Sequence, residues 1–331
     1  MTTLRKLSVV HESWPIAGSF SISRGTKTTA EVIKVTLEQD GTIGVGESVP
    51  YARYNETIDA TLDALQAARV EIEAGCTRGD VQKILSLHAA QNALDCALWD
   101  LEAKLTGTPV WQLAGLDKQP EPIITAYTLS LETPEKMAEA AAKANERPLL
   151  KIKLGGDGDH ERLRAIRAAA PDTRLIIDAN EAWKPADLDN HLAVCAETSV
   201  ELVEQPLPAG DDEALRGLGR TDVLICADES AHGKEDLHKL AGKYSAINIK
   251  LDKTGGLTEA LALAQAAREQ DFEIMIGCML ATSLAMAPGH IVGQHARVVD
   301  LDGPLLLAKD REPGIRFEGS LMYPPPPALW G

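Results

Sequence analysis

The chain has few cysteines, no long apolar run and too few basic residues to balance its acidic ones. Its 5 cysteines are scattered through 331 residues without the Cys-x-x-Cys or Cys/His spacing of a zinc site, so we expect reduced thiols in the core. The apolar run at residues 7–10 is too short for a secretory signal, and no stretch approaches the roughly 18 apolar residues of a membrane span. We therefore expect a cytoplasmic protein without membrane association.

Acidic residues dominate the charge balance. Lysine and arginine total 33 against 49 aspartate and glutamate residues, a formal net charge of −16. Because nucleic-acid backbones favour basic surfaces, we expect no nucleic-acid partner. The balance still allows a local basic pocket for a small ligand. With 25% charged and 44% hydrophobic residues, the composition is that of a folded globular protein rather than a disordered one.

Two sequence patterns divide the chain near residue 120. Residues 30–37 alternate and are rich in β-branched side chains, and an Asp-Gly pair separates them from a second alternating run at residues 43–47. This arrangement predicts a β-hairpin. Long Ala- and Leu-rich stretches with helical spacing follow, for example residues 90–105. We therefore expect residues 1–120 to form a separate α+β domain.

From about residue 123 onward, short apolar runs alternate with Ala-rich amphipathic segments such as residues 134–144, 160–170 and 257–270. Alternating strands and helices predict a parallel sheet. The expected strands are residues 123–128, 149–153, 175–178, 200–204, 223–228, 246–250, 273–277 and 298–301.

No convincing helix follows the eighth expected strand. The α/β fold class predicted for residues 121–305 is therefore a (β/α)7β barrel, a modified TIM barrel. The remaining tail, residues 306–331, is expected to pack back on the N-terminal domain.

Three acidic residues end consecutive expected strands: Asp178, Glu204 and Asp228. The carboxyl ends of barrel strands meet at one mouth, and neighbouring strands lie about 5 Å apart. Carboxylates this close repel one another unless a cation lies between them, and oxygen ligands suit Mg²⁺. Each acid alone could instead cap the helix that follows its strand. Three acids in consecutive units favour the metal site.

Lysines flank these acids. Lys151 and Lys153 are two residues apart in one expected strand and therefore point to the same face, and Lys250 ends a strand on the other side of the acids. A buried lysine shifts its pKa readily and can serve as a general base. Taken alone, Lys250 could also be a surface lysine or an ion-pair partner.

These residues lie in segments that resemble the enolase superfamily, muconate-lactonizing subgroup, over nearly the whole chain. The segments are Lys151-Ile-Lys153, Asp178-Ala-Asn180, Val203-Glu-Gln-Pro206, Ala227-Asp-Glu-Ser230 and residues 248–256. Two further features, Asp300-Leu-Asp302-Gly-Pro304 and Arg24-Gly25, resemble the bacterial dipeptide epimerases within that subgroup. The resemblance makes the N-terminal domain a capping domain whose loops determine specificity.

The resemblance implies an isomerase that epimerises L-Ala-D-Glu and L-Ala-L-Glu at the C-terminal residue, with Mg²⁺ and through an enediolate, in murein peptide metabolism. Lys153 and Lys250 would lie on opposite faces of the substrate α-carbon, one removing the proton and the other returning it. Lys151 and the metal would hold the substrate's terminal carboxylate.

The resemblance also assigns the substrate's other groups. Asp300 and Asp302 would bind the ammonium of the dipeptide, which their charge suits. Arg24 would pair with the side-chain carboxylate of the glutamyl residue, and Thr128 matches a substrate-contacting position. Asn180 and Glu229 are expected to orient metal ligands and lysines.

Other reactions remain open at this point, because fold and metal site do not determine the overall chemistry. A cycloisomerase or an acid-sugar dehydratase of the same subgroup would use similar metal ligands. Neither has an obvious use for two acids where an ammonium binds, so the Asp300/Asp302 pair favours a small dipeptide as the partner. A non-catalytic metal-binding barrel is a further alternative, and the sequence leaves homo-oligomerisation undecided.

Overall fold

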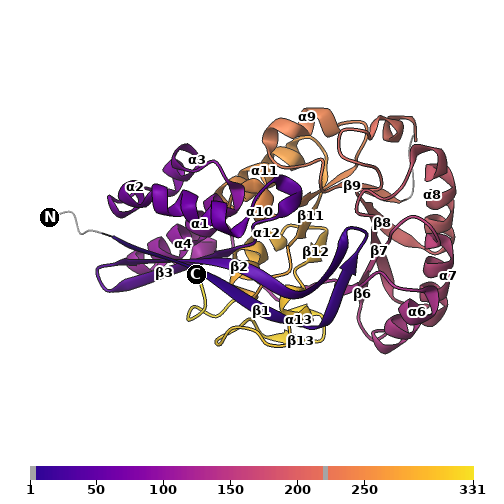
Figure 1. Cartoon of the computed structure of the whole chain (residues 1–331), viewed down its shortest axis with the longest axis horizontal. Coiled ribbons are helices and arrows are strands. Elements are labelled where there is room, and N and C mark those ends of the chain that lie inside the picture. Colours follow the sequence, from indigo (N-terminus) through magenta and orange to yellow (C-terminus); the bar gives the residue numbers. More distant parts are fainter. Residues whose placement is uncertain (1–4, 219–222) are drawn as a thin grey trace.

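The structure, a computed structural model, describes residues 5–218 and 223–331. The N-terminal part forms an α+β capping domain beside a barrel of parallel strands and helices (Figure 1). The end of the chain lies at the capping domain (Figure 1). In the part of the chain that the structure describes, no helix is both long and apolar enough to cross a lipid bilayer.

The capping domain is built on a three-stranded antiparallel sheet of β1 (Lys6–Ile22), β2 (Gly25–Gln39) and β3 (Thr42–Ser48). The predicted hairpin is present: Asp40 and Gly41 connect β2 and β3 with φ angles of 53° and 76°. Positive φ at both central residues matches the twist of the flanking strands, which is why an Asp-Gly pair occurs here.

The long helix α4 (His88–Thr106) packs on β3. A Cβ atom added to Gly44 or Gly46 would lie 2.4 Å or 2.2 Å from a backbone oxygen of α4, so only glycine permits this close approach. The other helices of this domain are short: η1 (Ala52–Tyr54), α1 (Ile58–Ala67), α2 (Arg69–Glu73), η2 (Arg78–Asp80), α3 (Val81–Ile84) and α5 (Val110–Leu113).

Eight parallel strands form the barrel in chain order, as predicted. They are β5 (Tyr127–Leu129), β6 (Leu149–Lys153), β7 (Arg174–Asp178), β8 (Val200–Glu204), β9 (Leu224–Ala227), β10 (Ala246–Ile249), β11 (Glu273–Gly277) and β12 (Val298–Asp300). The first and last strands are joined where the Ala126 amide donates to the Val299 carbonyl at 2.8 Å, and the Leu301 amide donates to Thr125 Oγ1 at 2.8 Å. These contacts close the barrel.

The first barrel strand is shorter than the predicted segment 123–128. Ile123 and Ile124 form β4, which pairs antiparallel with β14 (Leu321–Met322) of the C-terminal tail, next to β13 (Phe317–Glu318). The apolar run therefore belongs to two different sheets, with residues 125–126 between β4 and β5.

Helices follow the barrel strands. They are α6 (Pro134–Lys143), α7 (Asp159–Ala169), η3 (Pro185–Asp187), α8 (Leu188–Glu197), η4 (Glu213–Gly217), η5 (Lys234–Asp236), α9 (Leu237–Leu240), α10 (Leu251–Thr254), α11 (Leu257–Glu269), α12 (Ser283–Gly293) and α13 (Gly303–Leu306). Helix α6 begins with a proline after Thr133, whose hydroxyl accepts the Lys136 amide, a common helix start. Only the four-residue helix α13 follows β12.

The C-terminal tail contacts helix α4 of the capping domain. Trp330 is buried, and its Nε1 donates to the Cys96 carbonyl at 3.0 Å. The Gly331 amide donates to Asp100 Oδ1 at 2.7 Å. These contacts hold the end of the chain against α4. All 5 cysteines are free thiols, and four of them are buried.

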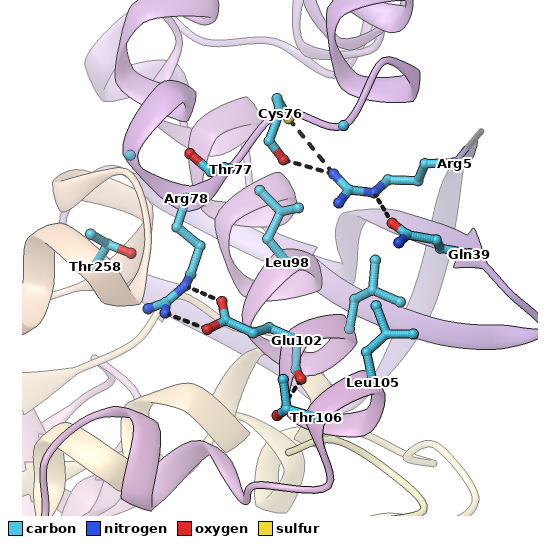
Figure 2. Close-up of a pocket in the computed structure, with 13 residues that line it drawn as sticks. Arg5, Gln39, Cys76, Thr77, Arg78, Leu98, Glu102, Leu105, Thr106 and Thr258 are labelled. Carbon is cyan, nitrogen blue, oxygen red and sulfur yellow. Dashed lines mark hydrogen bonds and ion pairs between the residues drawn. The ribbon is translucent and has the colours of Figure 1, made fainter. Parts of the chain in front are cut away.

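A cavity of about 450 Å³ lies in the capping domain (Figure 2). Arg78 closes one side by pairing with both carboxylate oxygens of Glu102, at 2.9 and 3.0 Å, and by lying over the Trp99 ring. None of the ionisable residues at the barrel mouth lines this cavity.

The capping domain meets the barrel at a buried carboxyl group. Asp252 of α10 accepts hydrogen bonds on Oδ1 from the Val49 amide at 2.9 Å and from Asn92 Nδ2 at 2.7 Å. Burial raises the pKa of Asp252 to about 7. Since the folded pKa exceeds the unfolded value, the folded state binds more protons, and stability falls as pH rises from about 4 to about 7.

We expect Asp252→Asn to remove this loss, because the amide oxygen can still accept both hydrogen bonds. The stability advantage of the variant over the parent should grow by about 2 kcal/mol between roughly pH 5.5 and pH 8. Urea unfolding at the two pH values measures this difference. Asp63→Asn, at an exposed position of α1, is the control and should leave the pH profile unchanged. Equal pH profiles for the parent and Asp252→Asn would contradict the prediction.

Candidate active site

Ten buried ionisable side chains gather at the carboxyl ends of the barrel strands. Six are carboxylates and four are lysines, and none is more than 8% exposed. The acids are Asp178, Glu204, Asp228, Glu229, Asp300 and Asp302, and the lysines are Lys151, Lys153, Lys250 and Lys253. This face of a barrel is where active sites form, because residues distant in sequence converge there.

The three predicted metal-binding acids lie side by side with a lysine on each. Strand pairing aligns Asp178 with Lys153 on one side and with Glu204 on the other. Lys153 donates to Asp178 Oδ2 at 2.6 Å, and Lys250 donates to Asp228 Oδ2 at 2.7 Å. The Nζ atom of Lys151 lies 2.6 Å from Glu204 Oε2.

The lysines determine the protonation of these acids. Burial raises the pKa of Asp178, but the charges of Lys153 and Lys151 outweigh it and lower the pKa to about 2. Burial likewise opposes ionisation of Asp228, and Lys250 with Lys253 holds its pKa well below the usual value. For Glu204, burial and the charge of Asp178 raise the pKa despite Lys151. The acids also raise the pKa of Lys250 well above its usual value, although burial acts in the opposite direction.

The donor set fits a hard divalent cation. Three buried oxygens, Asn180 Oδ1, Glu229 Oε2 and Asn248 Oδ1, accept no hydrogen bond from the described residues. Such buried oxygens need a partner, and an oxygen-only set suits Mg²⁺. Among the described residues, no three Asp, Glu, His or Cys side chains already form a ready cluster for a metal. The lysine ammonium groups are the partners of the three acids instead.

Lysines enter the site from opposite walls of the barrel. Lys151 and Lys153 lie in β6, whereas Lys250 directly follows β10. Strands β6 and β10 are four positions apart in an eight-stranded barrel, so they face each other across it. The acid-bearing strands β7, β8 and β9 lie between them. Ammonium groups therefore approach the acids from two opposite walls of the barrel.

A second acidic group lies opposite Glu204. Asp300 ends β12, and its Oδ2 atom accepts from Lys151 Nζ at 2.7 Å, while its buried Oδ1 atom has no partner in the described residues. Asp302 Oδ2 accepts the Thr128 amide at 2.7 Å. Burial and the neighbouring charge of Asp300 raise the pKa of Asp302 to about 7. Thr128 thus contributes its backbone amide to this group.

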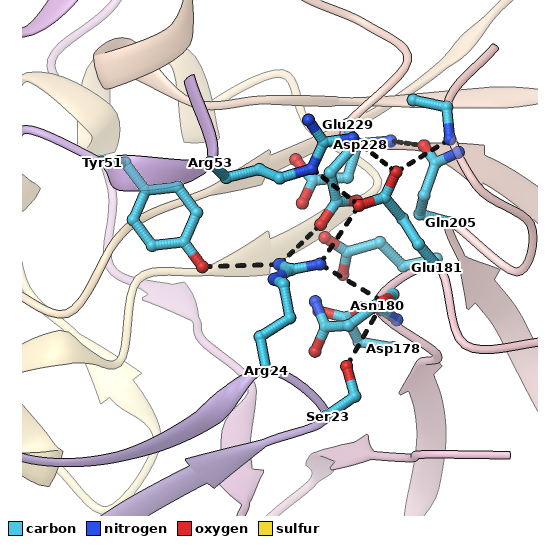
Figure 3. A network of polar contacts seen from close by, with 12 residues as sticks. Ser23, Arg24, Tyr51, Arg53, Asp178, Asn180, Glu181, Gln205, Asp228 and Glu229 are labelled. Carbon is cyan, nitrogen blue, oxygen red and sulfur yellow. Dashed lines mark hydrogen bonds and ion pairs between the residues drawn. The ribbon is translucent and has the colours of Figure 1, made fainter. Parts of the chain in front are cut away.

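Arg24 reaches the barrel mouth from the turn between β1 and β2 (Figure 3). Its guanidinium donates to Glu229 Oε1 at 2.8 Å, to the Asn180 carbonyl at 3.2 Å and to Glu181 Oε2 at 3.3 Å. It also donates to the Tyr51 hydroxyl at 3.4 Å. The side chain is 29% exposed, so solvent reaches part of it.

The sequence analysis expected Asn180 and Glu229 to orient metal ligands and lysines, and only Asn180 makes such a contact. The Asn180 amide donates to Asp178 Oδ1 at 2.9 Å and so holds this predicted metal ligand through the backbone. Glu229 instead pairs with Arg24. Burial and the charge of Asp228 raise the pKa of Glu229 to about 7.

Sequence reasoning missed Lys253 and Asn248 as site residues. Lys253 donates to Asp228 Oδ1 at 2.6 Å and to the Asp228 and Asn248 carbonyls at 2.6 and 2.9 Å. Asn248 Nδ2 donates to Glu204 Oε1 at 2.6 Å. The one available signal was position, since Asn248 and Lys253 lie two residues before and three residues after Lys250 and both belong to the segment at residues 248–256.

Comparison with known families covers both parts of the chain. A family described as mandelate racemase / muconate lactonizing enzyme, N-terminal domain, matches residues 4–115. A second family, described as enolase C-terminal domain-like, matches residues 135–322. The chain is 45% identical to the L-Ala-D/L-Glu epimerase of Escherichia coli (strain K12), over 95% of this chain and 98% of that protein. It is also 43% identical to an N-acetyl-D-glutamate racemase of Pseudoalteromonas sp, over 91% of this chain and 95% of that protein.

Solved structures are similar over the whole chain. An enolase family member from Agrobacterium tumefaciens with bound sodium and L-Ala-L-Glu is 51% identical, with a TM-score of 0.97 and coverage of 99% of this chain and all of that one. A dipeptide epimerase from Enterococcus faecalis V583, complexed with Mg and L-Leu-L-Tyr, is 30% identical with a TM-score of 0.90, and the match covers 97% of each chain.

A capped (β/α)7β barrel with buried acids and lysines at its mouth has the architecture of a barrel enzyme. The chain belongs to the enolase superfamily, as its sequence indicated. It is an epimerase, an enzyme of the isomerase class.

Proposed function

We propose that the protein is a Mg²⁺-dependent dipeptide epimerase that interconverts L-Ala-L-Glu and L-Ala-D-Glu. The observation that carries the proposal is the pair of buried lysines, Lys153 and Lys250, on strands that face each other across the barrel. Inverting a carbon centre requires a base on one face and an acid on the other. The proposal includes a role in murein peptide metabolism, which the resemblance to dipeptide epimerases implies.

Lys153 and Lys250 remove and return the proton on the substrate α-carbon. One of the two lysines must first be a neutral amine. Its nitrogen then takes the α-proton of the glutamyl residue while the C–H electron pair moves toward the substrate carboxylate. The opposite lysine donates its proton to the other face of the same carbon. The substrate is thereby inverted, and the two lysines have exchanged their protonation states.

The metal would be held by Asp178, Glu204 and Asp228. When bound, Mg²⁺ supplies positive charge that stabilises the second negative charge developing on the substrate carboxylate. Lys151 contributes a fixed positive charge to the same carboxylate, because the negative charges of Asp300 and Glu204 keep this lysine protonated. Burial opposes its charge, but these acids raise the pKa of Lys151 well above its usual value.

Asp300 and Asp302 bind the ammonium of the dipeptide. The unpartnered Asp300 Oδ1 atom is a buried acceptor at the barrel mouth, and a charged ammonium would satisfy it. Thr128 fixes Asp302 through its amide. We propose that the capping domain comprises residues 1–120. From this domain, the exposed part of Arg24 pairs with the glutamyl side-chain carboxylate.

A racemase of N-acetylated glutamate is the second candidate, because a relative of that name is 43% identical. Such a substrate lacks the ammonium and would leave Asp300 Oδ1 unpaired. The proposed barrel, residues 121–305, and the proposed tail, residues 306–331, would suit both reactions except at the acids after β12. These acids therefore distinguish the two candidates.

The test compares kcat/KM for L-Ala-L-Glu with kcat/KM for N-acetyl-L-glutamate. Circular dichroism measures the turnover of each substrate in the presence of Mg²⁺. Losing a charge-assisted contact and leaving a buried acid unpaired should make the N-acetylated substrate about 10²-fold poorer. A sample treated with chelator should lose activity and regain it with Mg²⁺. A preference for the N-acetylated substrate would contradict the dipeptide assignment.

A further inference from the structure

We propose that Glu181 is a positioning residue that holds Arg24 in place over the barrel mouth and thereby selects substrates with a side-chain carboxylate. The specificity part of this inference rests on the proposed function. Glu181 lies in the loop after β7, three residues beyond Asp178. The segments that resemble the enolase superfamily do not include Glu181.

Glu181 connects three separate parts of the molecule (Figure 3). Its carboxylate accepts two hydrogen bonds from Arg53 of the capping domain, at 2.8 and 2.9 Å, and one from the Ala209 amide after β8, at 2.8 Å. Arg24 contacts the same carboxylate at 3.3 Å. A parallel pair of hydrogen bonds between arginine and a carboxylate is geometrically specific.

The backbone aims this side chain. Asn180 and Glu181 both have positive φ angles, 46° and 68°, which non-glycine residues rarely adopt. This conformation is unfavourable for a residue with a Cβ atom, so contacts with the surroundings must hold it. The Glu181 amide donates to the Gln205 carbonyl at 2.9 Å, and the Trp183 amide donates to the Pro206 carbonyl at 3.0 Å. The loop is therefore attached to the next barrel loop at Glu181 and two residues beyond it.

Arg53 offsets part of the negative charge around Arg24. Two carboxylates, Glu181 and Glu229, contact Arg24, and together they would cancel its attraction for a substrate carboxylate. Arg53 pairs with Glu181 and offsets its charge. Glu181 can therefore anchor Arg24 without neutralising it.

The β1–β2 turn has a second attachment, so losing Glu181 should leave the fold intact. The Leu131 amide donates to the Ser21 carbonyl at 3.1 Å, and the Ser21 amide donates to Ser130 Oγ at 3.4 Å. Without Glu181, the turn stays at the barrel while the Arg24 guanidinium loses one of its two acidic anchors.

Steady-state kinetics of Glu181→Ala and Glu181→Gln with L-Ala-L-Glu and its uncharged analogue L-Ala-L-Gln tests the inference. In Glu181→Ala, KM for L-Ala-L-Glu should rise about 10-fold while kcat changes less than about 3-fold, and KM for L-Ala-L-Gln should stay nearly constant. Glu181→Gln keeps an acceptor oxygen for Ala209 and should show a smaller rise. Equal losses for both dipeptides would assign Glu181 a structural role only and overturn the proposal.

Glu197→Ala is the matched control. Glu197 forms the same two-bond pair with Arg164, at 2.9 and 2.8 Å, on the outside of the barrel. Its loss should change neither KM nor kcat.

Hydrogen–deuterium exchange gives a readout that does not depend on turnover. Exchange at residues 22–26 and 51–54 should become faster in Glu181→Ala and stay unchanged in Glu197→Ala. If the parent protein turns over neither dipeptide, the proposed function fails, yet faster exchange still supports Glu181 as the anchor. Unchanged exchange in Glu181→Ala would contradict the anchoring role itself.

Discussion

Replacing Lys250 with alanine is expected to lower kcat for epimerisation of L-Ala-L-Glu more than about 10³-fold, and Lys153→Ala should have an effect of the same size. Each variant retains one of the two opposed lysines. We therefore expect each to exchange the α-proton with solvent deuterium for one epimer only, and the two variants should accept opposite epimers. Mass spectrometry of each dipeptide after incubation in deuterated buffer measures this exchange.

Lys243→Ala controls for the loss of a buried ammonium. The Lys243 side chain is 8% exposed and pairs with Asp212 at 2.5 Å, outside the group of acids at the barrel mouth. Its removal should lower stability but leave the exchange pattern unchanged. Exchange of both epimers by Lys250→Ala and by Lys153→Ala would show that other groups move the proton.

The second large effect is expected at the acids after β12. Asp300→Asn and Asp302→Asn together should lower kcat/KM for L-Ala-L-Glu by about 10²-fold, because each loses a charged contact to the substrate ammonium. The amide oxygens can still accept from Lys151 and from the Thr128 amide, so the local structure is retained.

N-acetyl-L-glutamate serves as the internal control for this double variant. It carries no ammonium, so its low kcat/KM should change less than about 3-fold. The ratio of the two kcat/KM values should therefore fall toward one. A parallel loss for both substrates would indicate that the acids act on Lys151 rather than on the substrate.

The sequence predicted the barrel and its charged mouth because both follow from local patterns. Asp178 and Glu204 end apolar runs of strand length, and the structure ends β7 and β8 at these residues. Lys151 and Lys153 share a face because side chains alternate along a strand. The resemblance to the enolase superfamily added Arg24, whose position in a turn carries no signal of its own.

Contacts between distant segments could not be predicted in this way. Glu181 meets Arg53 across 128 residues of sequence, and the pairing depends on how the capping domain sits on the barrel. The predicted start of the first barrel strand was wrong for a similar reason, since Ile123 and Ile124 pair with the tail. Lys253 was missed because a lysine in a four-residue helix follows no periodic pattern.

Proton NMR of L-Ala-L-Glu with the parent enzyme and Mg²⁺ in deuterated water tests the central claim most directly. The account predicts that the glutamyl α-proton signal disappears while the L-Ala-D-Glu diastereomer grows in, deuterated at the same carbon. An unchanged spectrum, with the α-proton of L-Ala-L-Glu fully retained, would contradict the two-lysine epimerase.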